Sequence, residues 1–166
     1  MNSISGKITE LNYLFNQEEE ISKRSKLVTV TDEKNGSNRF VISNDSLCIT
    51  GGSIDKLNVG DNFVGFYDES LPVILIYPPQ YAAVAYAVNF PDTKNIKIDV
   101  FNEDLTSPDH QLTLNVSEET EIVMKNGEPY TGELIGETLA VIYTFTTRSI
   151  PAQTTPEKII VMNKNV

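Results

Sequence analysis

The sequence has few of the residues on which metal sites and thiol chemistry depend. Its 166 residues include one cysteine, Cys48, one histidine, His110, and no tryptophan. A single cysteine excludes an internal disulfide, and a single histidine cannot supply several imidazoles to a transition metal. A catalytic thiol needs a basic neighbour, and nothing in the sequence places His110 beside Cys48. We therefore expect no cofactor and no metal, with Cys48 as a small buried hydrophobe.

Long apolar runs and an excess of positive charge are also missing. The longest apolar run, from Ala82 to Val88, is far too short to span a bilayer. The first six residues lack the basic and apolar segments of a secretory signal, so we expect a protein that stays inside its cell or has lost a signal. The formal net charge is −10, and such a polyanion repels nucleic-acid phosphates and anionic membranes. We expect neither a nucleic-acid partner nor membrane insertion.

What the chain does have is internal similarity. Three segments recur in the same order: Ser43–Ile49 as Ser117–Val123, Val59–Tyr67 as Ile135–Tyr143, and Pro78–Gln80 as Pro151–Gln153. A recurring order of segments is the signature of a duplicated structural unit. We predict a first β repeat unit over residues 1–90 and a second over residues 91–166, packed on the first.

Strand signals dominate both halves. Apolar and polar residues alternate in Lys26–Thr31, Asn95–Val100 and Leu112–Val116, as in strands with one buried face. Asn35-Gly36 predicts a hairpin turn, and the more apolar Phe63–Tyr67 and Leu139–Phe145 predict deeply buried strands.

Helix signals are weak. Ser53–Leu57 predicts one helical turn capped by Ser53, and the charged segment Gln17–Arg24 predicts an exposed loop. The resulting fold class is all-β, an internally duplicated small OB-like barrel or a sandwich, with little helix.

Two proline-glutamine segments are the candidate binding sites. Proline fixes its own backbone angle and restricts the residue before it, so both segments are predicted to be stiff and extended. Stiff segments lose little entropy on binding. Their candidate contact residues are Tyr77, Pro78, Pro79, Gln80 and Tyr81 in the first segment and Arg148, Pro151 and Gln153 in the second. The alternative is structural, since prolines also protect the edges of sheets.

The same segments carry a family resemblance. The phrases Tyr77-Pro78-Pro79-Gln80-Tyr81 and Thr147–Lys158, which reads TRSIPAQTTPEK, resemble an uncharacterised β module of clostridia and other Firmicutes. Some proteins with that module also carry a domain similar to the N-terminal domain of copper amine oxidases. The resemblance covers most of the chain and implies an envelope, secreted or spore-associated module. It carries over neither copper nor oxidase chemistry, because one histidine cannot build that site.

We therefore predict a non-enzymatic binding or structural protein that acts through protein–protein contacts or self-assembly. The C-terminal run Lys158–Met162 is the candidate strand for adding to a neighbour's sheet. The alternative is a peptidase inhibitor that presents Arg148–Pro151 to a trypsin-like cleft. An enzyme, the third hypothesis, would require a pocket that joins His110 or Cys48 to a carboxylate.

Overall fold

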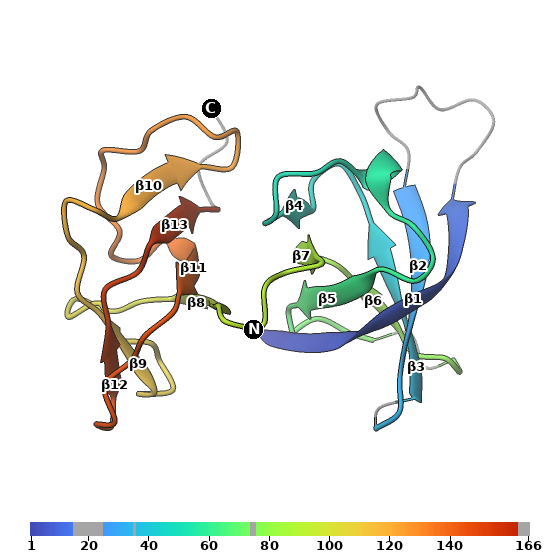
Figure 1. Ribbon diagram of the computed structural model, residues 1–166, viewed down its shortest axis with the longest axis horizontal. Coiled ribbons are helices and arrows are strands. Elements are labelled where there is room, and N and C mark those ends of the chain that lie inside the picture. Colours follow the sequence, from blue (N-terminus) through green and yellow to red (C-terminus); the bar gives the residue numbers. More distant parts are fainter. Residues whose placement is uncertain (15–24, 35, 74–75, 163–166) are drawn as a thin grey trace. The chain divides into compact units, whose positions relative to one another are not determined.

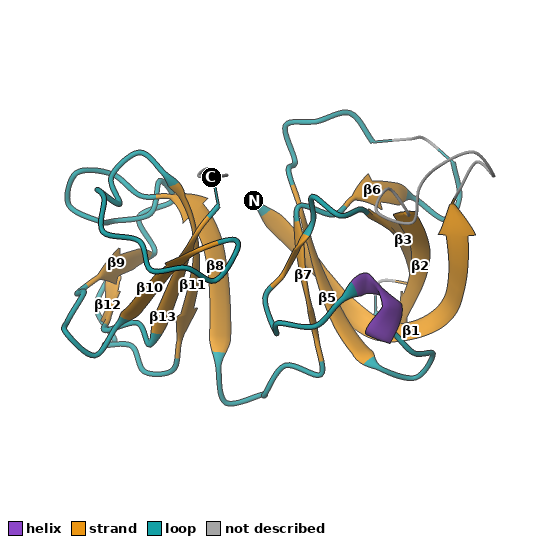
Figure 2. Ribbon diagram, turned by 90° about the horizontal axis from the view of Figure 1, so that it is seen from above, coloured by secondary structure: helices purple, strands orange, loops and turns teal. Residues whose placement is uncertain are grey.

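The computed structural model describes residues 1–14, 25–34, 36–73 and 76–162 (Figure 1). The chain divides into two compact units, Met1–Phe90 and Pro91–Val166. Strands make up 47% and helix 2% of the chain, which confirms the all-β prediction. One 3₁₀ turn, Ile54–Lys56, forms where a helical turn was predicted (Figure 2), but Ser53 makes no side-chain cap to it. The predicted loop at Gln17–Arg24 lies outside the described residues.

The first unit is built on one seven-stranded sheet. Its strands are β1 (Asn2–Leu14), β2 (Ser25–Asp32), β3 (Gly36–Ile42), β4 (Leu47–Cys48), β5 (Asn62–Tyr67), β6 (Gln80–Ala82) and β7 (Ala85–Val88), in the order β4-β7-β5-β1-β2-β3-β6. The pairs β3–β6 and β4–β7 are parallel, and the other neighbours are antiparallel. The predicted hairpin is confirmed, because Asp32 pairs with Gly36 across the β2–β3 turn.

The longest strand, β1, was not predicted from the sequence. Its register with β2 shifts between Ile8 and Glu10, and such a bulge breaks the alternation that marks a strand. A Cβ atom on Gly6 would lie 2.6 Å from the carbonyl oxygen of Thr31, so a side chain at this position would force the backbones apart. The first half of β1 pairs with β5 and the second half with β2.

Aromatic rings fill the core of the first unit. Phe40 is fully buried, with its ring centroid 5.6 Å from that of Phe63 and 5.7 Å from that of Tyr81. Phe63 in turn stacks on Tyr86 at 5.9 Å. A Cβ atom on Gly65 would lie 2.7 Å from the Phe40 ring, so the missing side chain of this glycine leaves the space that the ring occupies.

The second unit has two smaller sheets. Its strands are β8 (Asn95–Val100), β9 (Leu112–Leu114), β10 (Glu121–Met124), β11 (Thr138–Tyr143), β12 (Ala152–Thr154) and β13 (Lys158–Val161). One sheet has the order β10-β13-β11-β8 and the other pairs β12 with β9. The core is mostly aliphatic and combines Phe101 with Leu112, Leu114, Leu139, Val141, Ile159 and Val161.

The two units share one pattern of strand pairing. Phe63 pairs with Val88 between β5 and β7, as Leu139 pairs with Val161 between β11 and β13. The pairs β3–β6 and β4–β7 are parallel, as are β9–β12 and β10–β13.

A side-chain hydrogen bond also recurs between the units. The Ser46 hydroxyl donates to the carbonyl oxygen of Ala83 at 2.6 Å, and the Thr120 hydroxyl donates to that of Pro156 at 2.7 Å. The sequence similarity therefore corresponds to the same backbone arrangement in each unit.

The finer prediction of a barrel or sandwich needs correction. The sheets end on edge strands such as β4 and β6, and parallel pairs join strands from successive passes of the chain, so the arrangement is that of a β-solenoid. Alternation shows which face of a strand is buried but not which strand lies beside it. In the first unit, consecutive amides tie two distant strands together. Ala83 N–H donates to Val41 of β3 at 3.0 Å, and Val84 N–H donates to Phe66 of β5 at 2.8 Å.

Candidate functional site

The first proline-glutamine segment ends the loop between β5 and β6. The Arg39 amide donates to the carbonyl oxygen of Pro79 at 2.8 Å, and Gln80 begins β6 opposite Arg39. The Tyr81 ring lies 4.3 Å from that of Tyr67, and burial, with a smaller contribution from Tyr67, raises the pKa of the Tyr81 hydroxyl. Tyr77 is 85% exposed. The segment therefore splits into an anchored end, from Pro79 to Tyr81, and a projecting side chain.

The second segment forms a loop closed by hydrogen bonds at its base. The Thr147 amide donates to the carbonyl oxygen of Gln153, and the Gln153 amide donates to the Thr147 hydroxyl, both at 2.9 Å. Within the loop, the Ser149 hydroxyl donates to the carbonyl oxygen of Pro151 at 2.8 Å. Arg148 lies exposed between these anchors, and Ile150 is 86% exposed.

The two segments correspond in detail. Tyr77 and Ile150 each precede a proline, and both X-Pro bonds, to Pro78 and Pro151, are cis. The predicted extended conformation is wrong, because the backbone bends at residues 77–79 and 148–151 before β6 and β12 begin. In each unit the residue before the proline is the most exposed large apolar side chain of its loop. Sequence reasoning singled out Tyr77 but not Ile150.

An open groove of about 480 Å³ lies beside the second loop. Its lining is rich in hydroxyl and amide groups: Asn115, Thr144, Phe145, Thr146, Thr147, Gln153, Thr154, Thr155 and Glu157. Phe145 is 85% exposed and follows β11, which ends two residues earlier than the predicted strand. Gln153 accepts a hydrogen bond from the Asn115 amide at 3.2 Å. The groove and Ile150 thus belong to one stretch of the second unit.

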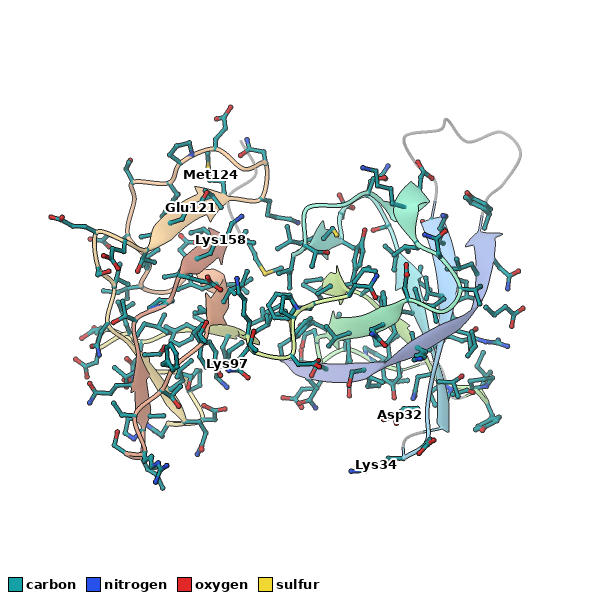
Figure 3. The ribbon with its side chains drawn as sticks, in the orientation of Figure 1. Asp32, Lys34, Lys97, Glu121, Met124 and Lys158 are labelled. Carbon is teal, nitrogen blue, oxygen red and sulfur yellow. The ribbon has the colours of Figure 1, made fainter. Side chains whose placement is uncertain are left out.

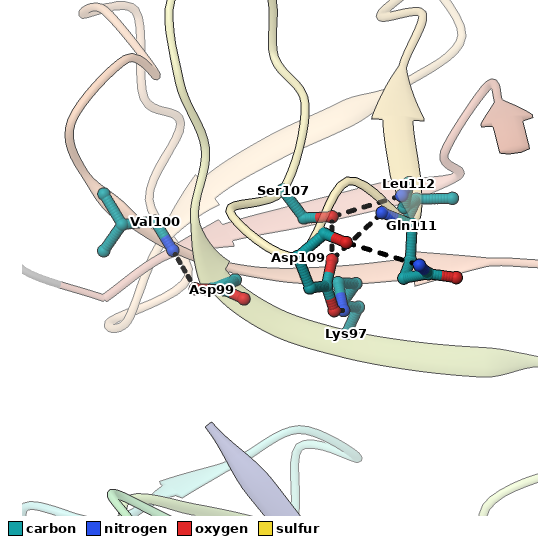
Figure 4. Close-up of polar contacts among 7 residues, drawn as sticks. All are labelled: Lys97, Asp99, Val100, Ser107, Asp109, Gln111 and Leu112. Atoms are coloured by element: carbon teal, nitrogen blue, oxygen red, sulfur yellow. Dashed lines mark hydrogen bonds and ion pairs between the residues drawn. The ribbon is translucent and has the colours of Figure 1, made fainter. Parts of the chain in front are cut away.

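The strongest charged network lies elsewhere in the second unit (Figure 4). Lys97 Nζ lies 2.8 Å from Asp109 Oδ2, and the Ser107 hydroxyl and the Gln111 amide donate to Asp109 Oδ1. Burial acts to raise the pKa of Asp109. The hydrogen bonds from Lys97, Ser107 and Gln111 outweigh it and lower the pKa to about 2. Ser107 is fully buried and also accepts the Leu112 amide, so the network stabilises its turn.

Cys48 and His110 lie in different units, and neither joins an acidic cluster. Cys48 is partly buried, and its sulfur lies 3.4 Å from the Thr50 hydroxyl. His110 is exposed, with a positive φ of 57°. Within residues 1–14, 25–34, 36–73 and 76–162, no group of three or more His, Cys, Asp or Glu side chains gathers as metal ligands do. None of the helices in that part of the chain has the length and apolarity needed to cross a membrane.

The C-terminal strand is not a free edge, which corrects the prediction that it adds to a neighbour's sheet. β13 pairs with β10 on one side and with β11 on the other. Figure 3 shows Glu121 and Lys158, the paired first residues of β10 and β13. Ile159 and Val161 are fully buried. Removing this strand would open the second core.

The chain was compared with protein-family models, with curated proteins and with solved structures, and none of them matches it. The resemblance to the clostridial module therefore stays a prediction.

Proposed function

We propose that the protein is a non-enzymatic binding module that contacts a partner protein through the tips of its two proline-containing loops. The observation that carries the proposal is the matched exposure of Tyr77 and Ile150, at 85% and 86%. Both side chains hold the position before a proline, and both loops are anchored to a sheet. A location at the cell envelope, in the medium or on a spore follows only from the family resemblance.

Exposed apolar side chains acquire meaning when they are held in place. Single exposed apolar residues are common and need no explanation. Here the base of the second loop is closed by Thr147 and Gln153, so a partner pays little entropy to order Ile150 and its neighbour Phe145. Large apolar side chains at the centre of an interface supply most of its binding energy. The sheet-bonded backbone and the exposed side chain thus serve different purposes in one segment.

The test is capture of partners by the purified protein from lysate and culture medium of the source organism. The double variant Tyr77→Ser/Ile150→Ser removes both tips and leaves the backbone anchors intact. We expect it to lose a partner that the wild type captures. The matched control is Val59→Ser, because Val59 is 63% exposed and lies outside both loops.

A partner retained by the double variant, or lost equally with Val59→Ser, would contradict the proposal. Capture of the chain by itself, with a doubled mass in solution that the tip substitutions abolish, would identify a second copy as the partner. A wild type that captures nothing specific from either source would also count against the loop tips as a recognition site.

Peptidase inhibition is the second candidate, and the hydrogen-bonded base of the Thr147–Gln153 loop favours it. An inhibitory loop has to be exposed and held rigid, and Arg148 is exposed within this one. Micromolar wild-type protein should then slow a trypsin-like peptidase, and Arg148→Ala should relieve the inhibition. Rapid cleavage after Arg148, or no effect of the wild type on the peptidase, removes this candidate.

We also propose that the first unit closes into the predicted OB-like barrel. The adjacent amide bonds from Ala83 to Val41 and from Val84 to Phe66 support this, as does a single core with residues from β1, β2, β3, β5 and β7. If the seam is closed, the Ala83 and Val84 amides exchange with solvent as slowly as those of central strands. Fast exchange at both amides would argue for an open, solenoid-like sheet.

A further inference from the structure

Three polar side chains lie in one row across the outer face of the first sheet. Thr29 of β2 pairs with Arg39 of β3, and Arg39 pairs with Gln80 of β6. Directly paired residues project from the same face with Cβ atoms about 5 Å apart. Their chain neighbours Val28 and Phe40 are fully buried in the core, so the row faces away from it.

Two atoms of this row are buried and lack a hydrogen-bond partner. They are Thr29 Oγ1 and Arg39 Nε, the only such side-chain atoms in the part of the chain that the structure describes. Thr29 is only 7% exposed. Buried polar groups are almost always hydrogen-bonded, so each exception calls for an explanation, such as a bound water or ion.

The unmet groups are confined to this row. Directly alongside it, the Thr31 hydroxyl is hydrogen-bonded to that of Ser37 at 3.1 Å and to that of Thr9 at 3.0 Å. Glu10, which pairs with Thr29 from β1, accepts a hydrogen bond from Asn12. Among the described residues the ion pairs are Lys94–Glu157 and Lys97–Asp109, so Arg39 has no carboxylate partner there.

We propose that Arg39, Thr29 and Gln80 bind a carboxylate group of the partner protein. An arginine guanidinium fits a carboxylate with two parallel hydrogen bonds, and the hydroxyl of Thr29 and the amide of Gln80 add further donors. A carboxylate is favoured over phosphate because the net charge of −10 repels a doubly charged anion more strongly.

This inference deepens the proposed function and rests on it. Gln80 directly follows Pro79, whose carbonyl oxygen accepts the Arg39 amide at 2.8 Å. The loop that ends at Gln80 also carries Tyr77, so a partner that contacts Tyr77 lies within a few residues of the row. An aspartate or glutamate of that partner would neutralise Arg39.

Acetate is the minimal probe for this site. Its binding is followed by ¹H–¹⁵N NMR of the full chain, with chloride holding the ionic strength constant. The chain has three arginines, Arg24, Arg39 and Arg148, so few side-chain Nε–H signals need assignment. We expect saturable shifts of the Arg39 Nε–H and Gln80 amide signals, with a dissociation constant on the order of tens of millimolar.

The substitution Arg39→Lys keeps the charge but loses the planar pair of donors, and it should weaken acetate binding about tenfold. Arg148→Lys is the matched control and should leave binding unchanged. Thr29→Val removes the unpaired hydroxyl at nearly constant shape. It should weaken acetate binding while leaving the denaturation midpoint unchanged or higher, because a hydroxyl with no partner stabilises nothing.

Three results would overturn the inference: no saturable shift at Arg39, binding unaffected by Arg39→Lys, or a lower denaturation midpoint for Thr29→Val with unchanged binding. Inorganic phosphate that binds more tightly than acetate would contradict the choice of a carboxylate. Acetate binding that persists when the loop-tip capture fails would leave this site standing and remove the partner surface at Tyr77. Failure of the reverse kind removes only the carboxylate site.

Discussion

The two units of this protein share a pairing register and differ in the side chains that fill their cores. At equivalent positions the first unit has Phe40 and Gly65, and the second has Leu114 and Val141. The Phe40 ring fills the space that a side chain on Gly65 would need. A large residue beside none has thus been exchanged for two of intermediate size. Cores tolerate such changes when the total volume is kept.

The units also differ at the strand that follows the first one. In the first unit β2 pairs along β1 and β3, whereas the described part of the second unit has only the isolated bridge Thr106–Thr113 beside β9. The Lys97–Asp109 pair lies in that region. A polar turn therefore stands where the first unit has a paired strand. Backbone pairing survives a large change of core chemistry, but each unit stabilises its edges in its own way.

The largest expected effect comes from emptying the aromatic core. Phe40→Ala should lower the free energy of unfolding by about 3–5 kcal/mol, because a fully buried ring leaves a cavity. Leu114→Ala at the equivalent position should cost less, about 2–4 kcal/mol. Amide hydrogen exchange in the full chain separates the two units. Equal losses, or exchange that rises in both units for either variant, would show that the cores do not act separately.

Importing one residue from the other unit should destabilise, and importing the pair should not. Gly65→Val places methyl groups against Phe40 and should cost about 1–3 kcal/mol through overpacking. The double variant Gly65→Val/Phe40→Leu recreates the pair of the second unit and should recover most of that loss. Chemical denaturation of the three proteins measures the coupling. Strictly additive effects would mean that the two positions do not share one volume.

The recurring hydroxyl bond should contribute similarly to both units. Ser46→Ala and Thr120→Val each remove a hydroxyl that donates to a backbone carbonyl, at Ala83 and Pro156. We expect losses of about 1 kcal/mol for each, and more where the carbonyl stays buried without a donor. A loss confined to one unit would show that the shared sequence motif has a structural role in only that unit.

The smallest expected effect is the acid sensitivity of the second unit. The pKa of Asp109 is lowered to about 2, so its contribution to stability is complete above the ordinary carboxyl pKa near 4. That contribution is lost as the pH falls toward 2. Lys97→Met should flatten this part of the stability profile, measured by denaturation at a series of pH values, and high salt should flatten it in the wild type. Identical profiles for both proteins would contradict the assignment.

Alternation along the chain predicted the simplest elements well. The bounds of β8, Asn95–Val100, match the predicted strand, because one buried face imposes a period of two. β1 escaped notice because its bulge after Ile8 and its glycine at position 6 interrupt that period. β11 ends at Tyr143, two residues early, because the chain turns there, and Phe145 becomes exposed.

The candidate binding residues were predicted only in part. The proline-glutamine phrases marked both loops, but the bend of each loop decides that Tyr77 projects while Tyr81 packs on Tyr67. Nothing in the phrase itself separates these two tyrosines. Thr29 and Arg39 were not singled out, because alternation assigns each to an outer face without saying that they are neighbours.

The sequence by itself determined that the chain is all-β, that its two halves repeat one order of segments, and which residues of the clearest strands face a core. These are local properties, written in periodicity and turn residues. The tertiary structure decided the neighbours: β13 lies between β10 and β11, Phe40 fills the space above Gly65, and Thr29 lies beside Arg39. Pairing between distant strands depends on register and packing, which act only once the chain has folded.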